Sequence, residues 1–358
     1  MERLGLVGLP NSGKSSLFNA LTEGSATVAA HPFSTTETSV GVAQIPDHRL
    51  DALAVMSKSE KVVPATVEMV DIAGLVAGAA SGEGLGNRFL AGIREVDALC
   101  LVLRAFDDDN IMGETDALEA LGVLELELVL ADAATIESQL DKRRKAARAD
   151  KALAGEVAAM EAALAVLHGG VPLYRSTLPA QIRVDLKSTF LLTNKPVLVV
   201  VNVGEDALGD LAGATKAVEA EVGQAGEVLA VNVQLEAEAS QLDPAGKAEL
   251  LEGLGLGEGV LPRLARAAQL LLGRRTFLTT GDKESRAWTF RAGAKAPECA
   301  GVIHSDLQRG FIRAEVIRWD ELLELGSWNA AKAAGRLRVE GKEYEVVDGD
   351  VVEIRFNV

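Results

Sequence analysis

The residues that could do chemistry begin near the N-terminus, where residues 8–15 read Gly-Leu-Pro-Asn-Ser-Gly-Lys-Ser. This loop follows an apolar run at 4–7 and precedes a helix-like pattern at 16–21, the order of strand, loop and helix that binds phosphate. Glycine lets successive backbone N–H groups turn inward, and the helix N-terminus adds partial positive charge. We expect Lys14 to reach the terminal phosphates and act in catalysis, and the Ser15 hydroxyl to hold Mg²⁺. The predicted nucleotide contacts here are Asn11, Ser12, Gly13, Lys14, Ser15 and Ser16.

Two further segments could complete a metal and γ-phosphate site. A polar loop at 31–37 offers Thr35 as a second Mg²⁺ ligand and catalytic group, with Thr36 as its close competitor. An apolar strand at 65–70 ends in Asp71, a candidate Mg²⁺ ligand, and the Gly74 N–H three residues later could meet the γ-phosphate. Leucine at position 75 cannot orient an attacking water. Hydrolysis must therefore use another group, a partner or a bound cation, for which K⁺ near Asn11 is a candidate.

A base-binding site is predicted at the ends of two later strands. The apolar run at 196–201 leads into Asn202-Val203-Gly204-Glu205, at the position of the Asn-Lys-x-Asp guanine reader but altered at two places. Glu205 is one methylene longer than aspartate, which misplaces its carboxylate for the paired donors of guanine. We therefore favour ATP over GTP, with Asn202, Val203 and Glu205 on one side of the base. Asn232 and Val233, which follow the strand at 228–231, lie on the other side.

The elements that must position these residues alternate as strands and helices, which predicts an α/β fold with a mixed, mostly parallel sheet. Two runs with apolar spacings of three and four, from Leu126 to Leu140 and from Leu153 to Leu167, predict an antiparallel coiled-coil insertion. Composition shifts near Arg274, and residues 341–356 read as strand, Asp-Gly turn and strand in a small α+β module. We place the nucleotide-binding domain at 1–113 and 190–273, the insertion at 114–189 and the C-terminal module at 274–358.

The tip of the insertion is locally basic on an acidic chain. The chain has 358 residues and a formal net charge of −16, so its surface as a whole repels nucleic acid and anionic membranes. Arg143, Arg144, Lys145 and Arg148 stand out against that background as candidate contacts to RNA phosphates. A solvated helix end is the alternative explanation. The two cysteines, far apart in sequence, and the lack of a membrane-length apolar run indicate a reducing, cytoplasmic setting.

In combination these motifs resemble the YchF family of Obg-like P-loop ATPases. The resemblance also rests on Pro-Phe-Ser-Thr at 32–35, Asp-Ile-Ala-Gly-Leu-Val at 71–76, Gly-Glu-Gly-Leu-Gly-Asn at 82–87, Arg-Ala-Trp-Thr-Phe at 286–290, Gly-Phe-Ile-Arg-Ala-Glu at 310–315 and Arg-Phe-Asn-Val at 355–358. It spans nearly the whole chain and implies a C-terminal TGS domain of β-grasp fold. It also implies ATP and ADP as ligands, Mg²⁺ as cofactor, and the ribosome (50S or 70S) with its rRNA as partner, without membrane or sequence-specific DNA binding.

Several positions depart from the family pattern. Ser12 stands where valine is usual, Thr38-Ser39 replaces Pro-Asn, Met112-Gly113 follows Asn110-Ile111 where many members carry a histidine, and Asn232-Val233 replaces Ser-Ala. Two classes of function remain open at this point. One is a slow ATPase, or a GTPase of the same fold, that switches its hold on the ribosome. The other is a ribosome- or RNA-binding module in which nucleotide is mainly structural and hydrolysis incidental.

Overall fold

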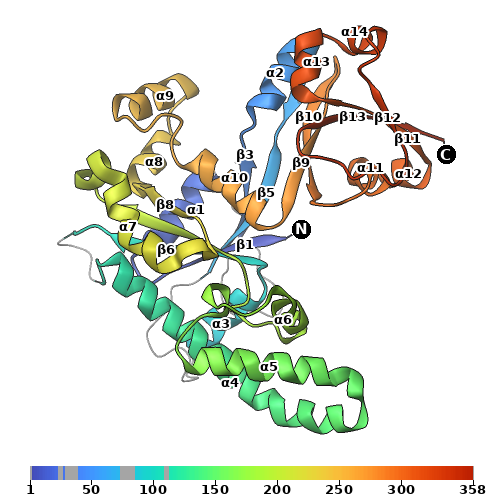
Figure 1. The fold of residues 1–358 in the computed structure, drawn as a ribbon. Helices are drawn as coiled ribbons and strands as arrows, with labels where there is room; N and C mark the ends of the chain where they lie inside the picture. The colour runs from blue at the N-terminus through green and yellow to red at the C-terminus, as the bar shows by residue number, and fades with distance from the viewer. Residues whose placement is uncertain (1, 23–26, 29–38, 73–84, 109–112, 358) are drawn as a thin grey trace. The chain divides into compact units, whose positions relative to one another are not determined.

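The computed structural model describes residues 2–22, 27–28, 39–72, 85–108 and 113–357 (Figure 1). The chain forms two compact units, one of residues 1–43 and 68–272 and the other of residues 44–67 and 273–358. None of the helices in these described ranges is both long and apolar enough to cross a membrane.

The first unit is built on a seven-stranded sheet with strand order β2-β3-β5-β1-β6-β7-β8. Strand β1 runs parallel to both of its neighbours, β5 and β6, and β7 runs parallel to its neighbours β6 and β8. Strand β2 pairs antiparallel with β3. The predicted mixed, mostly parallel sheet is thus confirmed. Its strands are β1 (Arg3–Val7), β2 (Thr27–Val28), β3 (Ser39–Ile45), β5 (Ala65–Asp71), β6 (Ala98–Ala105), β7 (Val197–Val203) and β8 (Val228–Val231).

Helices cover both faces of this sheet because its central strands are apolar on both sides. On β6, Leu99, Leu101 and Leu103 belong to one buried cluster, which also contains residues of α3, α4 and α7. Helices α1 and α10 pack against β1 and β7 respectively. The helices of this unit outside the insertion are α1 (Lys14–Thr22), α3 (Leu85–Arg94), α7 (Leu211–Val222), α8 (Val233–Ala239), α9 (Pro244–Gly253) and α10 (Leu261–Leu271).

The helical insertion is a hairpin of α4 (Ala117–Ala149) and α5 (Ala154–His168), joined through the short helix η2 (Lys151–Leu153). Its two helices run antiparallel, as the ion pair between Glu137 and His168 and the one between Arg144 and Glu161 show. Val129, Ala133, Ile136 and Leu140 are buried against α5 as the spacing predicts, but Leu126 is exposed. The return to the sheet passes through η3 (Leu173–Arg175), α6 (Ala180–Asp185) and η4 (Leu186–Thr189).

The second unit contains a six-stranded sheet with order β12-β11-β13-β9-β10-β4. The parallel pair β13 and β9 lies in its middle, with antiparallel partners on either side and α11 packed on the buried face, which is the β-grasp arrangement. Its elements are α2 (His48–Ser57), β4 (Lys61–Val63), β9 (Arg274–Thr279), β10 (Glu284–Arg291), α11 (Ala296–Ile303), α12 (Ser305–Arg309), β11 (Phe311–Arg318), α13 (Trp319–Leu325), α14 (Trp328–Ala333), β12 (Arg338–Glu340) and β13 (Asp350–Phe356).

Two features of this unit differ from the sequence prediction. Residues 44–67, predicted within the nucleotide-binding domain, fold here, because β4 pairs with β10 and the Ser59 hydroxyl bonds the Gly281 carbonyl at 2.6 Å. In the tail, the Asp-Gly turn and β13 form, but the predicted strand before the turn is wrong. That segment makes one isolated bridge, from Glu345 to Lys295. In this segment the Val347 N–H and the Tyr344 hydroxyl both donate to the Asp350 carboxylate.

Candidate nucleotide-binding site

The glycine-rich loop connects β1 to α1 at the carboxyl edge of the sheet, the edge at which parallel α/β sheets bind ligands. A side chain at Gly8 would collide with the Val102 carbonyl, since a Cβ there would lie 2.4 Å from that oxygen. Gly13 has a φ of +92° and Asn11 a φ of 63°, so the chain curls through two left-handed residues. Left-handed residues of this kind allow the backbone N–H groups of a loop to form an anion-binding concavity.

Lys14 and Ser15 stand at the start of α1, beside the end of β5. Lys14 is 7 % exposed and its ammonium donates to the Leu9 carbonyl at 3.1 Å, so it lies over its own loop. Burial lowers the pKa of Lys14, while the negative charge of Asp71 opposes that shift. The Ser15 hydroxyl donates to Asp71 Oδ2 at 2.6 Å. The structure therefore brings together the two described residues that the sequence predicts as Mg²⁺ ligands.

These two oxygen ligands suit Mg²⁺, a hard cation that takes oxygen donors and keeps several waters. No cluster of three or more His, Cys, Asp or Glu side chains that could hold a metal occurs in the described ranges. A Mg²⁺ ion here would be shared between protein and phosphate oxygens, the usual arrangement in nucleotide sites. Thr35 and Gly74, the other predicted metal and catalytic residues, lie outside the described residues, as does Leu75.

Asn202, at the end of β7, ties the loop to the base side of the site. Its side chain is buried at 4 % exposure; Nδ2 donates to the Ser12 carbonyl at 3.1 Å, and Oδ1 accepts from Val233 N–H at 3.2 Å. Asn232 caps α8 by accepting from Leu235 N–H at 2.9 Å, which fixes the start of that helix. One amide thus sets the spacing between the phosphate loop and the strand-end loop after β8.

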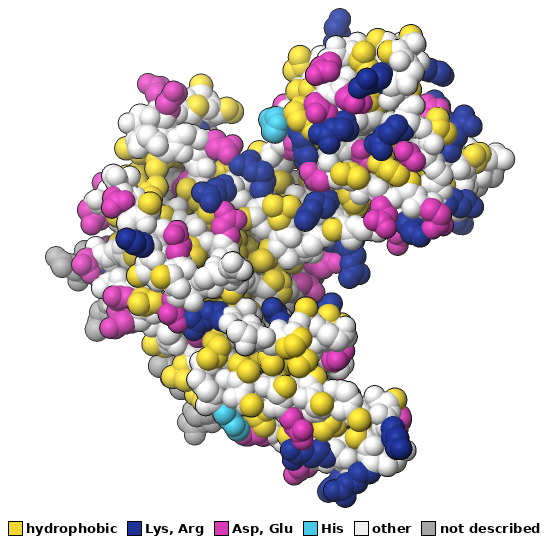
Figure 2. Space-filling model, in the orientation of Figure 1, with side chains coloured by type: hydrophobic (Ala, Val, Ile, Leu, Met, Phe, Trp, Pro, Cys, Tyr) yellow, Lys and Arg dark blue, Asp and Glu magenta, His cyan; other side chains and the backbone are white. Residues whose placement is uncertain are grey.

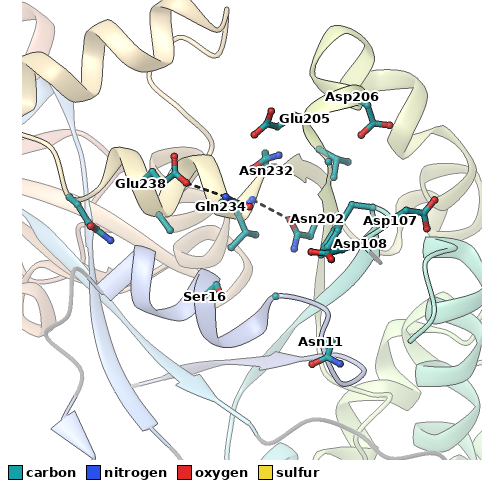
Figure 3. A pocket seen from close by; sticks show the side chains of 17 residues that line it. Asn11, Ser16, Asp107, Asp108, Asn202, Glu205, Asp206, Asn232, Gln234 and Glu238 are labelled. Atoms are coloured by element: carbon teal, nitrogen blue, oxygen red, sulfur yellow. Dashed lines mark hydrogen bonds between the residues drawn. The ribbon is translucent and has the colours of Figure 1, made fainter. Parts of the chain in front are cut away.

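A cavity of about 750 Å³ opens beside this amide (Figure 3). Asn11 lies at one end of it, and Glu205 and Asp206 lie at the other. The volume is in the range of small-molecule sites. Its lining residues are Asn11, Gly13, Ser16, Phe106, Asp107, Asp108, Asn202, Val203, Gly204, Glu205, Asp206, Asn232, Val233, Gln234, Ala237, Glu238 and Gln241.

The predicted base-side residues Val203, Glu205, Asn232 and Val233 all line this cavity. Of the predicted loop residues, Asn11, Gly13 and Ser16 line it too, whereas Ser12, Lys14 and Ser15 do not. The Ser12 side chain is buried, at 2 % exposure. Sequence reasoning missed Asp107 and Asp108, which follow β6 at the same carboxyl edge, and Glu238 on α8. The position of the aspartates directly after a buried strand was an available signal. Glu238 lines the cavity because of the orientation of α8, which no local sequence pattern indicates.

The predicted RNA-contact residues lie around the hairpin tip, where Figure 2 shows basic side chains gathered. Arg143 pairs with Glu156 at 3.4 Å, and Arg144 pairs with Glu161 at 2.8 Å. Lys145 and Arg148 are exposed and form no ion pair with any residue that the structure describes. Half of the predicted set therefore bridges the two helices, and the other half faces solvent.

A phosphate loop, a strand-end aspartate and a base-side asparagine on one parallel sheet edge define a P-loop nucleotide-binding protein of the GTPase class. The comparisons agree, since a family model described as "50S ribosome-binding GTPase" matches residues 3–125. The model of the YchF-GTPase C-terminal family, described as a protein of unknown function, matches residues 275–357. The chain belongs to the YchF family.

The relatives cover the chain end to end. It is 44 % identical over 361 residues to "Ribosome-binding ATPase YchF" of Bacillus subtilis, covering 99 % of both chains. It is also 44 % identical to the protein of that name from Haemophilus influenzae, again with 99 % of each covered. Among solved structures, the Schizosaccharomyces pombe YchF GTPase matches with a TM-score of 0.86 and 32 % identity, covering 99 % of this chain and 97 % of that one.

Proposed function

We propose that this protein is a Mg²⁺-dependent, ATP-binding P-loop switch that hydrolyses ATP slowly and associates with the ribosome in the cytoplasm. The observation that carries the proposal is the pair of hydrogen bonds that join the phosphate loop to Asp71 on one side and to Asn202, which lines the cavity, on the other. The names of the bacterial relatives, which call those proteins ribosome-binding ATPases, support the choice of nucleotide and partner.

In this proposal the loop residues 11–16 hold the phosphates and Lys14 neutralises the terminal ones. Mg²⁺, held by Ser15, Thr35 and Asp71, would neutralise charge that develops on the β- and γ-phosphate oxygens. Gly74 N–H would meet the γ-phosphate. A K⁺ ion near Asn11 would supply further positive charge in place of the missing glutamine.

The choice of ATP rests on the base side of the cavity. Glu205 lies on its wall in place of the aspartate that accepts two donors from guanine. Calorimetric titration with ATP, ADP, GTP and GDP analogues, with and without Mg²⁺, tests the choice. Complementary contacts to a base are worth about 1–3 kcal/mol, or roughly ten- to hundred-fold in affinity. We expect ATP to bind tighter by that order and Glu205→Asp to shift the preference toward GTP. Equal affinities would count against the proposal.

GTP is the second candidate, because the matching structure from S. pombe is called a GTPase and the N-terminal family model is one of GTPases. The same titration separates the two nucleotides. Measuring hydrolysis with and without ribosomes then separates a switch from a module with incidental turnover. A switch is expected to hydrolyse nucleotide faster when ribosomes are added, and a module is not.

The ribosome contact is proposed at the hairpin tip, through phosphates of rRNA. Counterion release makes such binding weaken steeply with salt. Because Arg143 and Arg144 are used inside the hairpin, the sharper test reverses Lys145 and Arg148 to Glu. Co-sedimentation with ribosomes should fall and depend less on salt, whereas basal hydrolysis should stay unchanged. A matched control reverses Lys58 and Lys216, exposed lysines outside the helical hairpin. Equal pelleting by the tip variant and the parent at every salt concentration would refute the contact.

A further inference from the structure

Lys195 lies where the chain returns from the helical insertion to β7. Its ammonium donates to the carbonyls of Ile93 at 2.8 Å, Arg94 at 3.0 Å and Val96. Ile93 and Arg94 lie at the C-terminal end of α3, where the last carbonyls of a helix have no partner within the helix, and Val96 lies two residues beyond that end. An ammonium group has three donors and no acceptor, and the negative end of the helix dipole attracts it. Lys195 therefore fastens the end of α3 to the return segment.

The same return segment is fastened to the insertion by Asp132 of α4. Asp132 is 1 % exposed, and its carboxylate accepts from Leu192 N–H at 2.8 Å, Thr193 N–H at 2.7 Å and the Thr193 hydroxyl at 2.6 Å. In addition, the Thr193 carbonyl accepts from Tyr174 N–H at 2.9 Å. A buried carboxylate with this many bonds has one arrangement, because losing a bond would leave charge unsatisfied away from water.

Helix α3 in turn packs against the residue next to the candidate metal ligand. Phe89 and Ile93 of α3 share a buried cluster with Ile72. Gly92 permits a close approach, since a Cβ there would lie 3.2 Å from Ile72 Cγ2. Ile72 follows Asp71, whose carboxylate accepts the Ser15 hydroxyl at 2.6 Å. An unbroken series of packed contacts thus joins α4 to the metal end of the nucleotide site.

We infer that Lys195 is a positioning residue. It couples the contact between α4 and the return segment at residues 192–195 to Asp71, and through Asp71 to Mg²⁺ and hydrolysis. The inference rests on the proposed function and deepens it, because it names the path by which a partner bound to the hairpin would change turnover.

The coupling is measurable in the free protein, without nucleotide. Hydrogen exchange of the α3 amides is followed in Lys195→Met, Asp132→Asn, the double variant and Lys187→Met, an exposed lysine of the return segment as matched control. Loss of the equivalent of one net hydrogen bond should speed α3 exchange by about tenfold in each single variant. In the double variant, the increase in the α3 exchange rate should be smaller than the product of the increases in the two single variants. The exchange rate of the control variant should equal that of the parent. If Asp132→Asn leaves α3 unchanged, or if the two effects simply multiply, the coupling does not exist.

The Mg²⁺ dependence of nucleotide binding distinguishes positioning from general destabilisation. In Lys195→Met, affinity without Mg²⁺ should stay within about twofold of the parent, and the Mg²⁺ concentration for half-maximal tightening should rise by about tenfold. Equal losses with and without Mg²⁺ would overturn the positioning role. If the parent itself binds no nucleotide, the proposed function fails, and the exchange measurements still decide whether hairpin and α3 are coupled.

Discussion

Replacing Asn202 with Ala should loosen the phosphate loop and the start of α8 together, because one buried amide holds both. The variant removes the donor to the Ser12 carbonyl at 3.1 Å and the acceptor of Val233 N–H at 3.2 Å. Both backbone groups are then left without these partners next to the cavity. The substitution should therefore affect stability and nucleotide affinity at once.

The magnitude follows from the two bonds. A buried polar group that loses its partner costs about 1–3 kcal/mol, so two such groups set an upper limit of roughly 6 kcal/mol. Water can enter from the adjoining cavity and replace part of each bond, which places the expected loss of unfolding free energy near the lower end, about 2–3 kcal/mol. Nucleotide affinity should fall by about tenfold or more, because the loop N–H groups would no longer be held in one arrangement.

Chemical denaturation and calorimetric titration measure the two effects, with two companion variants as controls. Asn202→Asp keeps the shape and the acceptor for Val233 N–H but sets an oxygen against the Ser12 carbonyl, so it should weaken nucleotide binding. Asn232→Ala removes the helix cap to Leu235 N–H and should cost about 1 kcal/mol. If Asn202→Ala were no less stable than Asn232→Ala and bound nucleotide like the parent, the bridging role would be refuted.

Four further variants test single features of the site and its supports. Ser12→Ala should raise the unfolding free energy by about 1 kcal/mol in denaturation, because the buried Ser12 hydroxyl has no hydrogen-bond partner among the described residues; a lower value contradicts this. Lys14→Ala should keep the fold but lose about ten- to hundred-fold in nucleotide affinity, since charged hydrogen bonds contribute about 1.5–3 kcal/mol; unchanged calorimetry would remove Lys14 from the site. Glu236 of α8 accepts a hydrogen bond from Val260 N–H, and burial raises its pKa. Its contribution to stability is therefore complete below the ordinary value of 4.5 and is lost as pH rises through the folded pKa. Glu236→Gln should flatten that decline in a denaturation series across pH, and an unaltered slope would argue against it. Burial lowers the pKa of Lys195 from 10.5 to about 8, so the folded chain holds fewer protons in that window and stability gains with rising pH. Lys195→Met should abolish this gain, and its persistence would show that another group causes it.

The elements nearest the chemistry could be predicted because their signals are local. An apolar run followed by a polar or glycine-rich loop marks the carboxyl end of a parallel strand, and Lys14, Asp71 and Asn202 all follow such runs. Parallel strands bring those ends to one edge whatever the distance in sequence. The sequence could therefore place these residues together without knowing the sheet order.

The supports of the site could not be predicted, because their partners are distant and their patterns weak. Asp132 reads as one polar residue within a helix, yet its bonds go to residues 192 and 193. Lys195 reads as a surface lysine before a strand. Residues 46–64 lie between β3 and β5 of the first sheet, and it is tertiary contacts such as the pairing of β4 with β10 that assign the segment 44–67 to the second unit. Each case depends on a tertiary contact with no local signature.

The hairpin tip shows how pairing changes what a charge count means. Counting residues 141–151 gives six positive and two negative charges, but Glu156 and Glu161 come from α5 beyond that window. Arg143 and Arg144 are occupied by these carboxylates and help to hold the two helices together. An RNA phosphate would have to displace a carboxylate at either arginine and would meet nearby negative charge. The exposed lysines and Arg148 carry no such cost, so any phosphate contact should form through them first.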